Sequence, residues 1–358
     1  MDRFAAATGV TTRGGRRYLW TDAFAVCNWV GLGEVERAEA LVERVHFTLG
    51  RHREDDAREG WISGLDEAAG AARPTAGGLR IGKPLPERAE GEPYDPELEW
   101  ERDGQYFHYL TRWIRALDRM SGVTGDARYR GWAIELGRVA FDRFSHGIGP
   151  VPNRLYWKMS IDLSRPLIPS MGQHDPLDGY VVLSELQAGG GASDLEEAIG
   201  LLAGMAEDGD WATDDPLGAG SLLADAWFLA SGSGDTERSR RLERVLDAGV
   251  RSVREVRDQR ILELPAARRL PFRELGLAIG LAAVERLAGR GGTELPSAAA
   301  RGVVAALHEA TPLRAEIARF WLDERSRRAP TWLEHQDINT VMLATALAPD
   351  GYLGPEPG

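Results

Sequence analysis

The sequence predicts an all-α protein in which six helical hairpins close into a barrel with long loops at one end. Two observations carry this prediction. Apolar residues recur at i, i+3, i+4 and i+7 along most of the chain, which is the spacing of helices with one buried face. The helical segments also come in pairs, repeated about every 50 residues, and a repeated supersecondary unit indicates an array of such units.

The first helix of each pair is apolar over more of its circumference than the second, so it needs cover on several sides. We therefore expect an inner and an outer ring. The inner helices are predicted at 19–30, from 99 to the turn at 124–126, and at 180–186, 217–230, 271–284 and 338–348. The outer helices are predicted at 34–49, 127–144, 195–205, 238–256, 298–308 and 313–327.

The connections between helices differ at the two ends of the predicted barrel. Short Gly-rich turns join inner to outer helices, as at Thr124-Gly-Asp126, 231–235 and 289–292. The returning connections are long, polar and rich in Trp. The longest, 50–97, carries Trp61 and Lys83, and a loop of this length inside a compact domain is usually either disordered or functional. A strand is weakly indicated over 154–165. We expect the functional residues at this elaborate end.

Composition limits the function classes. No Pro/Ser-rich linker or charge run divides the 358 residues, so we expect one domain, 1–358. A net charge of −12 argues against nucleic acid as a partner. The single Cys27 excludes a disulfide within the chain. No signal peptide or apolar run of about 18 residues is present, which favours a cytoplasmic protein without membrane contact; a homo-oligomer stays open.

Acids, histidines, amides and tryptophans gather where the inner helices begin. A carboxylate at a helix start is stabilised by the helix dipole whatever its role, so one such acid carries little information. Its recurrence does carry information. The residues at these starts are Trp20, Asp22, Trp100, Asp103, Gln105, His108, Gln173, His174, Asp175, Asp178, Arg273, Glu274, His335, Gln336 and Asp337, while Trp157 and Lys158 lie in a connecting segment.

Six hairpins, acidic inner-helix starts and the turn Thr-Gly-Asp-Ala-Arg-Tyr (124–129) resemble the six-hairpin glycosidase superfamily, whose fold is the (α/α)6 barrel. The segment Arg-Asp-Gly-Gln-Tyr-Phe-His-Tyr (102–109) is similar to the helix start where unsaturated-uronide hydrolases of that fold carry a catalytic aspartate. The resemblance implies that Asp103 is this aspartate and that Asp175 is its partner. It covers roughly residues 18–348 and identifies no particular sugar.

Glycosidic cleavage needs one carboxylic acid to protonate the leaving oxygen and a second carboxylate to activate water or attack the sugar. We assign these roles to Asp103 and Asp175, with Asp22 and Glu274 as reserves. Structural readings compete: Asp178 is equally well the N-cap of the third inner helix, and Glu274 is equally well ion-paired. The expected substrate-binding residues are Trp20, Trp100, Gln105, His108, Trp157, Lys158, Gln173, His174, Asp178, Arg273, His335, Gln336 and Asp337.

Two other functions stay open. The same fold serves N-acylglucosamine 2-epimerases, and His174 and His335 are loose candidates for their paired histidines. A non-enzymatic helical-repeat binding protein is the third reading, although irregular polar loops at one end argue against an open repeat scaffold. No close-spaced histidine pair or phosphate-loop spacing is present, so we expect neither a metal nor a cofactor.

Overall fold

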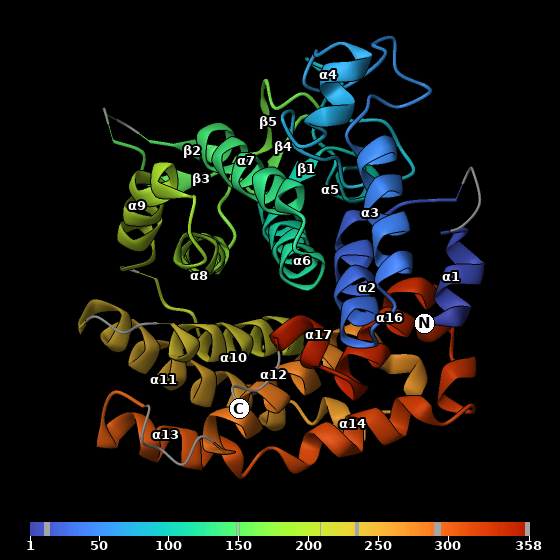
Figure 1. The fold of residues 1–358 in the computed structure, drawn as a ribbon. Coiled ribbons are helices and arrows are strands. Elements are labelled where there is room, and N and C mark those ends of the chain that lie inside the picture. Colours follow the sequence, from blue (N-terminus) through green and yellow to red (C-terminus); the bar gives the residue numbers. More distant parts are fainter. Residues whose placement is uncertain are drawn as a thin grey trace. The chain divides into compact units, whose positions relative to one another are not determined.

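The computed structural model describes residues 1–10, 15–147, 149, 151–207, 209–232, 236–289 and 295–354, and this part of the chain is mostly helical (Figure 1). It divides into two compact units. The N-terminal unit is Phe4–Asp208 with Asp2, and the C-terminal unit is Gly209–Gly358 with Met1 and Arg3. The all-α prediction is confirmed, and the unit boundary falls between the third and fourth predicted hairpins. The single domain and the closed barrel stay predictions.

The N-terminal unit contains the first three hairpins. They are α2 (Leu19–Gly31) with α3 (Val35–Leu49), α6 (Phe107–Thr124) with α7 (Ala127–Phe144), and α8 (Asp175–Ala188) with α9 (Glu196–Glu207). The short helices are α1 (Asp2–Thr8), α4 (Glu67–Ala72), α5 (Pro96–Glu101) and η1 (Ser193–Leu195). The strands are β1 (Gln105–Tyr106), β2 (Ser145–His146), β3 (Arg154–Leu155), β4 (Lys158–Met159) and β5 (Pro166–Ile168).

Packing separates inner from outer helices as the apolar pattern predicts. Helix α6 contacts both α2 and α8, and each of the three also contacts its own hairpin partner (Figure 1). Nearly all of α2 is buried, from Leu19 to Trp29, whereas α3 buries a single stripe that includes Leu41, Val45 and Leu49. A helix buried on several sides is the inner member of its pair.

The strand predicted over 154–165 is replaced by shorter ones. Strands β1, β4 and β5 form a small antiparallel sheet in which Tyr106 pairs with Lys158, and β2 pairs with β3. The bend between β3 and β4 contains Trp157. The sheet therefore holds Trp157 beside the entrance of α6.

The predicted start of the second inner helix is wrong. Helix α5 ends at Glu101 and α6 begins only at Phe107, so Asp103 and Gln105 precede the helix. Gly104 adopts φ +145°, and a Cβ there would lie 2.7 Å from the carbonyl oxygen of Met159, so the chain turns sharply where only glycine fits. Sequence periodicity does not register such a break.

The third inner helix also begins at a different place from the predicted one. Helix α8 starts at Asp175, five residues before the predicted Tyr180, with His174 at the N-cap position. Asp178 therefore lies within the first turn and is not the N-cap. Its side chain instead accepts hydrogen bonds from Thr111 and Arg112 of α6.

The C-terminal unit contains the other helices. They are α10 (Pro216–Ser231), α11 (Thr236–Asp258), η2 (Ile261–Glu263), η3 (Ala266–Arg268), α12 (Pro271–Gly289), α13 (Ala298–His308), α14 (Pro312–Leu322), η4 (Ser326–Arg328), α15 (Pro330–Leu333), α16 (Gln336–Leu347) and α17 (Asp350–Leu353). Of the two turns predicted here, residues 233–235 and 290–292 lie outside the described part of the chain.

Helix α12 is the centre of this unit, in contact with α10, α13, α14 and α16 (Figure 1). It approaches α10 closely, because a Cβ on Gly220 would lie 2.0 Å from the carbonyl oxygen of Gly276. Two helices come this near only where neither has a side chain at the crossing. Among all the helices described, none is long and apolar enough to cross a membrane.

Candidate functional site

Asp175 and His108 form the most unusual polar pair of the N-terminal unit. Asp175 is the first residue of α8 and is 5% exposed, and His108 lies in the first turn of α6. The His108 Nδ1 lies 3.7 Å from Asp175 Oδ1, which is too long for a hydrogen bond. Neither His108 Nδ1 nor Asp175 Oδ2 has a hydrogen-bond partner within the described chain. Buried polar atoms without partners are rare, and a bound molecule would satisfy both.

Burial sets the charge of both groups. Burial raises the pKa of Asp175 to about 7, with a smaller contribution from the nearby Asp178 carboxylate. Burial lowers the pKa of His108 to about 4, with a smaller contribution from the Arg112 guanidinium. At neutral pH the imidazole is therefore uncharged and the carboxyl group retains a proton in about half of the molecules. The contact is not an ion pair, and the pair can both donate and accept a proton.

Neighbouring residues support this arrangement. Asp178 accepts hydrogen bonds from Arg112 Nη1 (2.5 Å) and from the Thr111 hydroxyl, both on α6. These bonds hold α8 against α6 and keep a negative charge one turn away from Asp175. Gly172 leaves room for the acid, because a Cβ there would lie 2.5 Å from Asp175 Oδ2.

Aromatic rings surround His108. Tyr106 and Trp157 stack on its imidazole with ring centres 5.3 and 6.3 Å away, and Tyr109 meets it edge-on at 4.9 Å. Tyr109 also contacts Trp20 and shares a 2.5 Å hydrogen bond between hydroxyls with Tyr18. We call these six residues, Tyr18, Trp20, Tyr106, His108, Tyr109 and Trp157, the aromatic cluster. Of these, the sequence predicts only Trp20, His108 and Trp157 as substrate-binding residues.

Asp103 is a structural anchor in this structure. It is 0% exposed, and its Oδ2 is bonded to Arg80 (2.8 Å) and Arg53 (3.3 Å). Its Oδ1 accepts from the backbone N–H groups of Gly82 (2.8 Å), Lys83 (3.3 Å) and Gly104 (3.1 Å). Because both oxygens are bonded and buried, these contacts give Asp103 a structural role, and the predicted acid or base role stays a prediction.

Gln105 and Lys158 likewise hold the fold together. The Gln105 amide bonds Leu79, Gly77 and Ile161. The Lys158 ammonium, fully buried, donates to the Glu99 carboxylate (2.9 Å) and to the carbonyl oxygens of Glu99 and Arg102 (2.7 and 2.8 Å). All three of its N–H donors are used, so neither residue has a group left for a substrate.

The two reserve acids are each paired with an arginine. Asp22 lies 3.5 Å from Arg17 and accepts from the backbone N–H of Tyr18 (3.1 Å). In the C-terminal unit, Glu274 accepts from Arg269 Nε (2.9 Å) and Nη2 (2.5 Å) and from Trp321 Nε1 (2.8 Å). Burial raises the pKa of Glu274, and Arg269 opposes that shift. The structural alternative for Glu274, a buried ion pair, is the one observed.

The other predicted residues are more open. Arg273 pairs with Asp215 at 2.8 Å, and the His335 ring meets Phe272 edge-on. Four of the predicted residues are exposed, namely Gln173, His335, Gln336 and Asp337. His174 is half-buried. Trp100 is 51% exposed, and its ring contacts the Lys83 ammonium. Within the described chain no group of three or more acid, His or Cys side chains could hold a metal ion.

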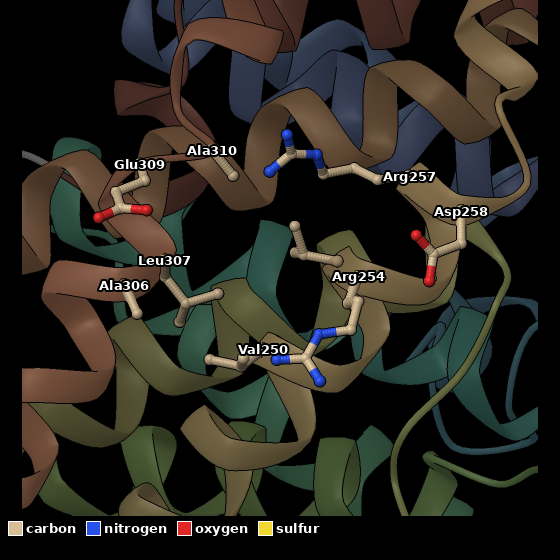
Figure 2. A pocket seen from close by; sticks show the side chains of 9 residues that line it. Val250, Arg254, Arg257, Asp258, Ala306, Leu307, Glu309 and Ala310 are labelled. Carbon is tan, nitrogen blue, oxygen red and sulfur yellow. The ribbon is translucent and has the colours of Figure 1, made fainter.

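A hollow of about 520 Å³ lies elsewhere, between α11 and α13 of the C-terminal unit (Figure 2). Val250 and Leu307 contribute to its lining, as do Arg254, Arg257 and Glu309 (Figure 2). None of the residues predicted from the sequence lines it. It lacks the buried, unpartnered polar atoms that mark the His108–Asp175 pair.

Comparison with known proteins adds no relative. The chain matches no protein-family model, and no curated protein or solved structure matches it.

Proposed function

We propose that the protein is a glycoside hydrolase on an (α/α)6 barrel, with Asp175 as the acid that protonates the leaving oxygen. The observation that carries this proposal is a buried carboxyl group with a pKa of about 7 and an unpartnered Oδ2, beside aromatic rings. A glycosidase acid must hold its proton at neutral pH, and burial is the usual means of raising its pKa. Aromatic faces such as Trp157 and Trp20 suit the apolar faces of sugar rings.

His108 supports the acid in this proposal. Its imidazole is uncharged at neutral pH, and its unpartnered Nδ1 lies 3.7 Å from Asp175 Oδ1, so it can exchange a proton with Asp175. It is too close to Asp175 to activate water on the opposite face of the sugar, because the two catalytic groups of a glycosidase lie roughly 5–9.5 Å apart. Its pKa of about 4 makes it about as basic as an ordinary carboxylate. Asp178 is a positioning residue that acts through Asp175. Asp103 is not part of the acid/base pair in this proposal.

A screen of mono- and oligosaccharides by thermal shift identifies ligands, because binding to the folded state alone raises the melting temperature. For each ligand, reducing-sugar release is then measured with the wild type and with Asp175→Asn. We expect the variant to bind the sugar and to lose turnover by about 10²–10⁴-fold, the usual contribution of a general acid. A folded Asp175→Asn protein with full turnover would refute the assignment.

His46 provides a matched control for His108. It is a histidine of the same unit that is buried, whereas the side chain of His108 is 28% exposed, and burial lowers the pKa of His46 to about 3. Its Nε2 accepts from Trp113 Nε1 at 3.1 Å, so it serves packing alone. His108→Gln should lower turnover with little loss of stability, whereas His46→Gln should lower stability and leave the turnover of the folded fraction unchanged.

The His108–Asp175 pair also favours a second function, sugar epimerisation. Two neighbouring groups that can donate and accept a proton at neutral pH suit the removal and return of a carbon-bound hydrogen. The histidines predicted for this chemistry, His174 and His335, would then be replaced by His108. Deuterium uptake from solvent into recovered sugar, without bond cleavage, identifies epimerisation, and cleavage without uptake identifies hydrolysis.

A further inference from the structure

Lysine is almost absent from this chain. Of its 43 Lys and Arg residues, only Lys83 and Lys158 are lysine. Both lie in the N-terminal unit, and both are buried, at 8% and 0% exposure. All remaining cationic positions of the chain are arginine. We therefore expect the surroundings of positions 83 and 158 to explain why lysine occurs there.

The hydrogen-bond geometry at position 158 explains why this residue is a lysine and not an arginine. Its ammonium meets three oxygens, one carboxylate and two carbonyls, at 2.7–2.9 Å. A tetrahedral ammonium with three donors fits this small buried site, and a planar guanidinium does not. Lys158 is therefore accounted for by structure alone.

Lys83 has no such explanation. Its Nζ makes no hydrogen bond and no ion pair within the described chain, and it lies between two aromatic rings. The ring centre of Trp100 is 4.8 Å away and that of Tyr18 is 5.6 Å away. Because Trp100 itself is 51% exposed, the amine is recessed but lies beside a surface residue.

The backbone that carries Lys83 is held rigidly. Asp103 accepts from the N–H groups of Gly82 and Lys83, while Arg53 donates to the carbonyl oxygens of Lys83 (2.8 Å) and Pro84 (2.9 Å). The charges buried around Asp103 thus fix residues 82–84 in place. This is the arrangement expected where one side chain must be presented accurately.

An amine in this position is easier to deprotonate than a free lysine. Burial lowers the pKa of Lys83, Glu101 and Asp103 oppose the shift, and Lys158 and Arg16 add to it. The two rings favour the ammonium form and restrain the shift. A neutral amine is a nucleophile, which an arginine cannot be, since its guanidinium stays protonated.

We propose that Lys83 is a nucleophilic amine that forms an imine with the aldehyde or ketone of a ligand that enters beside Trp100. The neutral amine attacks the carbonyl carbon to give a carbinolamine. Loss of water then leaves a C=N bond, and the carbonyl oxygen departs with the two protons of the amine. No oxidant or reductant is consumed. Small aldehydes and the open-chain forms of reducing sugars are the ligand class.

Reductive trapping tests this directly, because the chain offers so few amines. The full chain is incubated at pH 7 with glyceraldehyde and sodium cyanoborohydride, and modified peptides are quantified by mass spectrometry against time. We expect Lys83 to be alkylated at least tenfold faster than Nα-acetyl-lysine amide under the same conditions, with Lys158 unmodified. A Lys83 rate equal to or below that of the free lysine derivative overturns the proposal.

Two variants separate a nucleophile from a simple positive charge. Lys83→Arg keeps the charge and Lys83→Met keeps the apolar stem; both should remain folded and should lose the fast alkylation. An anion site is the alternative. It would appear as slow alkylation of Lys83 together with stabilisation by inorganic phosphate in both wild type and Lys83→Arg, and that result also overturns the proposal.

The inference is independent of the proposed hydrolase. Alkylation is read on the protein and requires no turnover, so Asp175→Asn should label at Lys83 at the wild-type rate. Trp100→Leu removes one wall of the site and should bring the Lys83 rate closer to that of the free derivative. Failure of sugar cleavage leaves the alkylation result unaffected, and slow alkylation leaves the Asp175 assignment unaffected.

Discussion

Replacing Asp103 by asparagine separates an anchor from a catalyst. The substitution keeps the shape of the side chain but removes a charge that faces Arg80 and Arg53. Breaking a buried ion pair by removing one partner costs about 3–5 kcal/mol, because the other charge stays buried without compensation. At about 2–4 °C per kcal/mol for a unit of this size, the melting temperature should fall by roughly 6–20 °C.

Differential scanning calorimetry of the full chain measures this fall in melting temperature. Hydrogen exchange at Gly82 and Lys83 should accelerate as well, since Asp103 holds both amides. Asp66→Asn is the control: Asp66 is an exposed N-cap that accepts from the Ala69 N–H, and asparagine caps a helix equally well. An Asp103→Asn protein with wild-type stability and no turnover would refute the anchor and restore the predicted catalytic role.

Three further predictions concern other parts of the structure. The raised pKa of Asp175 contributes stability that is present below pH 4 and is lost as the pH rises through about 7. Asp175→Asn should therefore be as stable as the wild type at pH 4 and more stable at pH 8.5. The expected difference in the free energy of unfolding at pH 8.5, measured in urea, is up to about 4 kcal/mol. Gly220→Ala places a methyl group 2.0 Å from a backbone oxygen of α12 and should cost about 1–3 kcal/mol in the same assay, whereas Gly302→Ala, in open space on α13, should be neutral or stabilising. Glu99→Gln should cost about 3–5 kcal/mol because it leaves the Lys158 charge buried, and the double change Glu99→Leu with Lys158→Met should cost less, both read from melting temperatures.

Helical periodicity predicted the all-α class and most of the long helices. It placed the helix over 298–308 at its observed bounds and α2, α10 and α11 within two residues, because one buried face leaves a repeating signal in the sequence. It misplaced the start of α6, where the 99–106 stretch looks amphipathic but is broken at Gly104. The conformation there depends on arginines 23 and 50 residues earlier in the chain, and no local pattern reports such contacts.

The sequence indicated several residues of the site, but not the contacts between their side chains. His108 and Asp175 both stand in polar helix starts, which drew attention to them in the sequence. Their approach to 3.7 Å depends on the packing of α6 against α8. Tyr18 and Tyr109 lie in ordinary amphipathic segments, and only the fold brings their hydroxyls together.

Whether an acid has its own arginine decides what it can do. Asp103, Asp22 and Glu274 each lie within 3.5 Å of a guanidinium, and in Glu274 that guanidinium opposes the rise in pKa that burial causes. Asp175 has a neutral imidazole instead, and its pKa is raised to about 7. This environment suits an acid that must hold and release a proton at neutral pH, because a permanent cation beside it would stabilise the ionised form. Of the four acids that the sequence proposed for catalysis, Asp175 is therefore the one whose surroundings suit proton transfer.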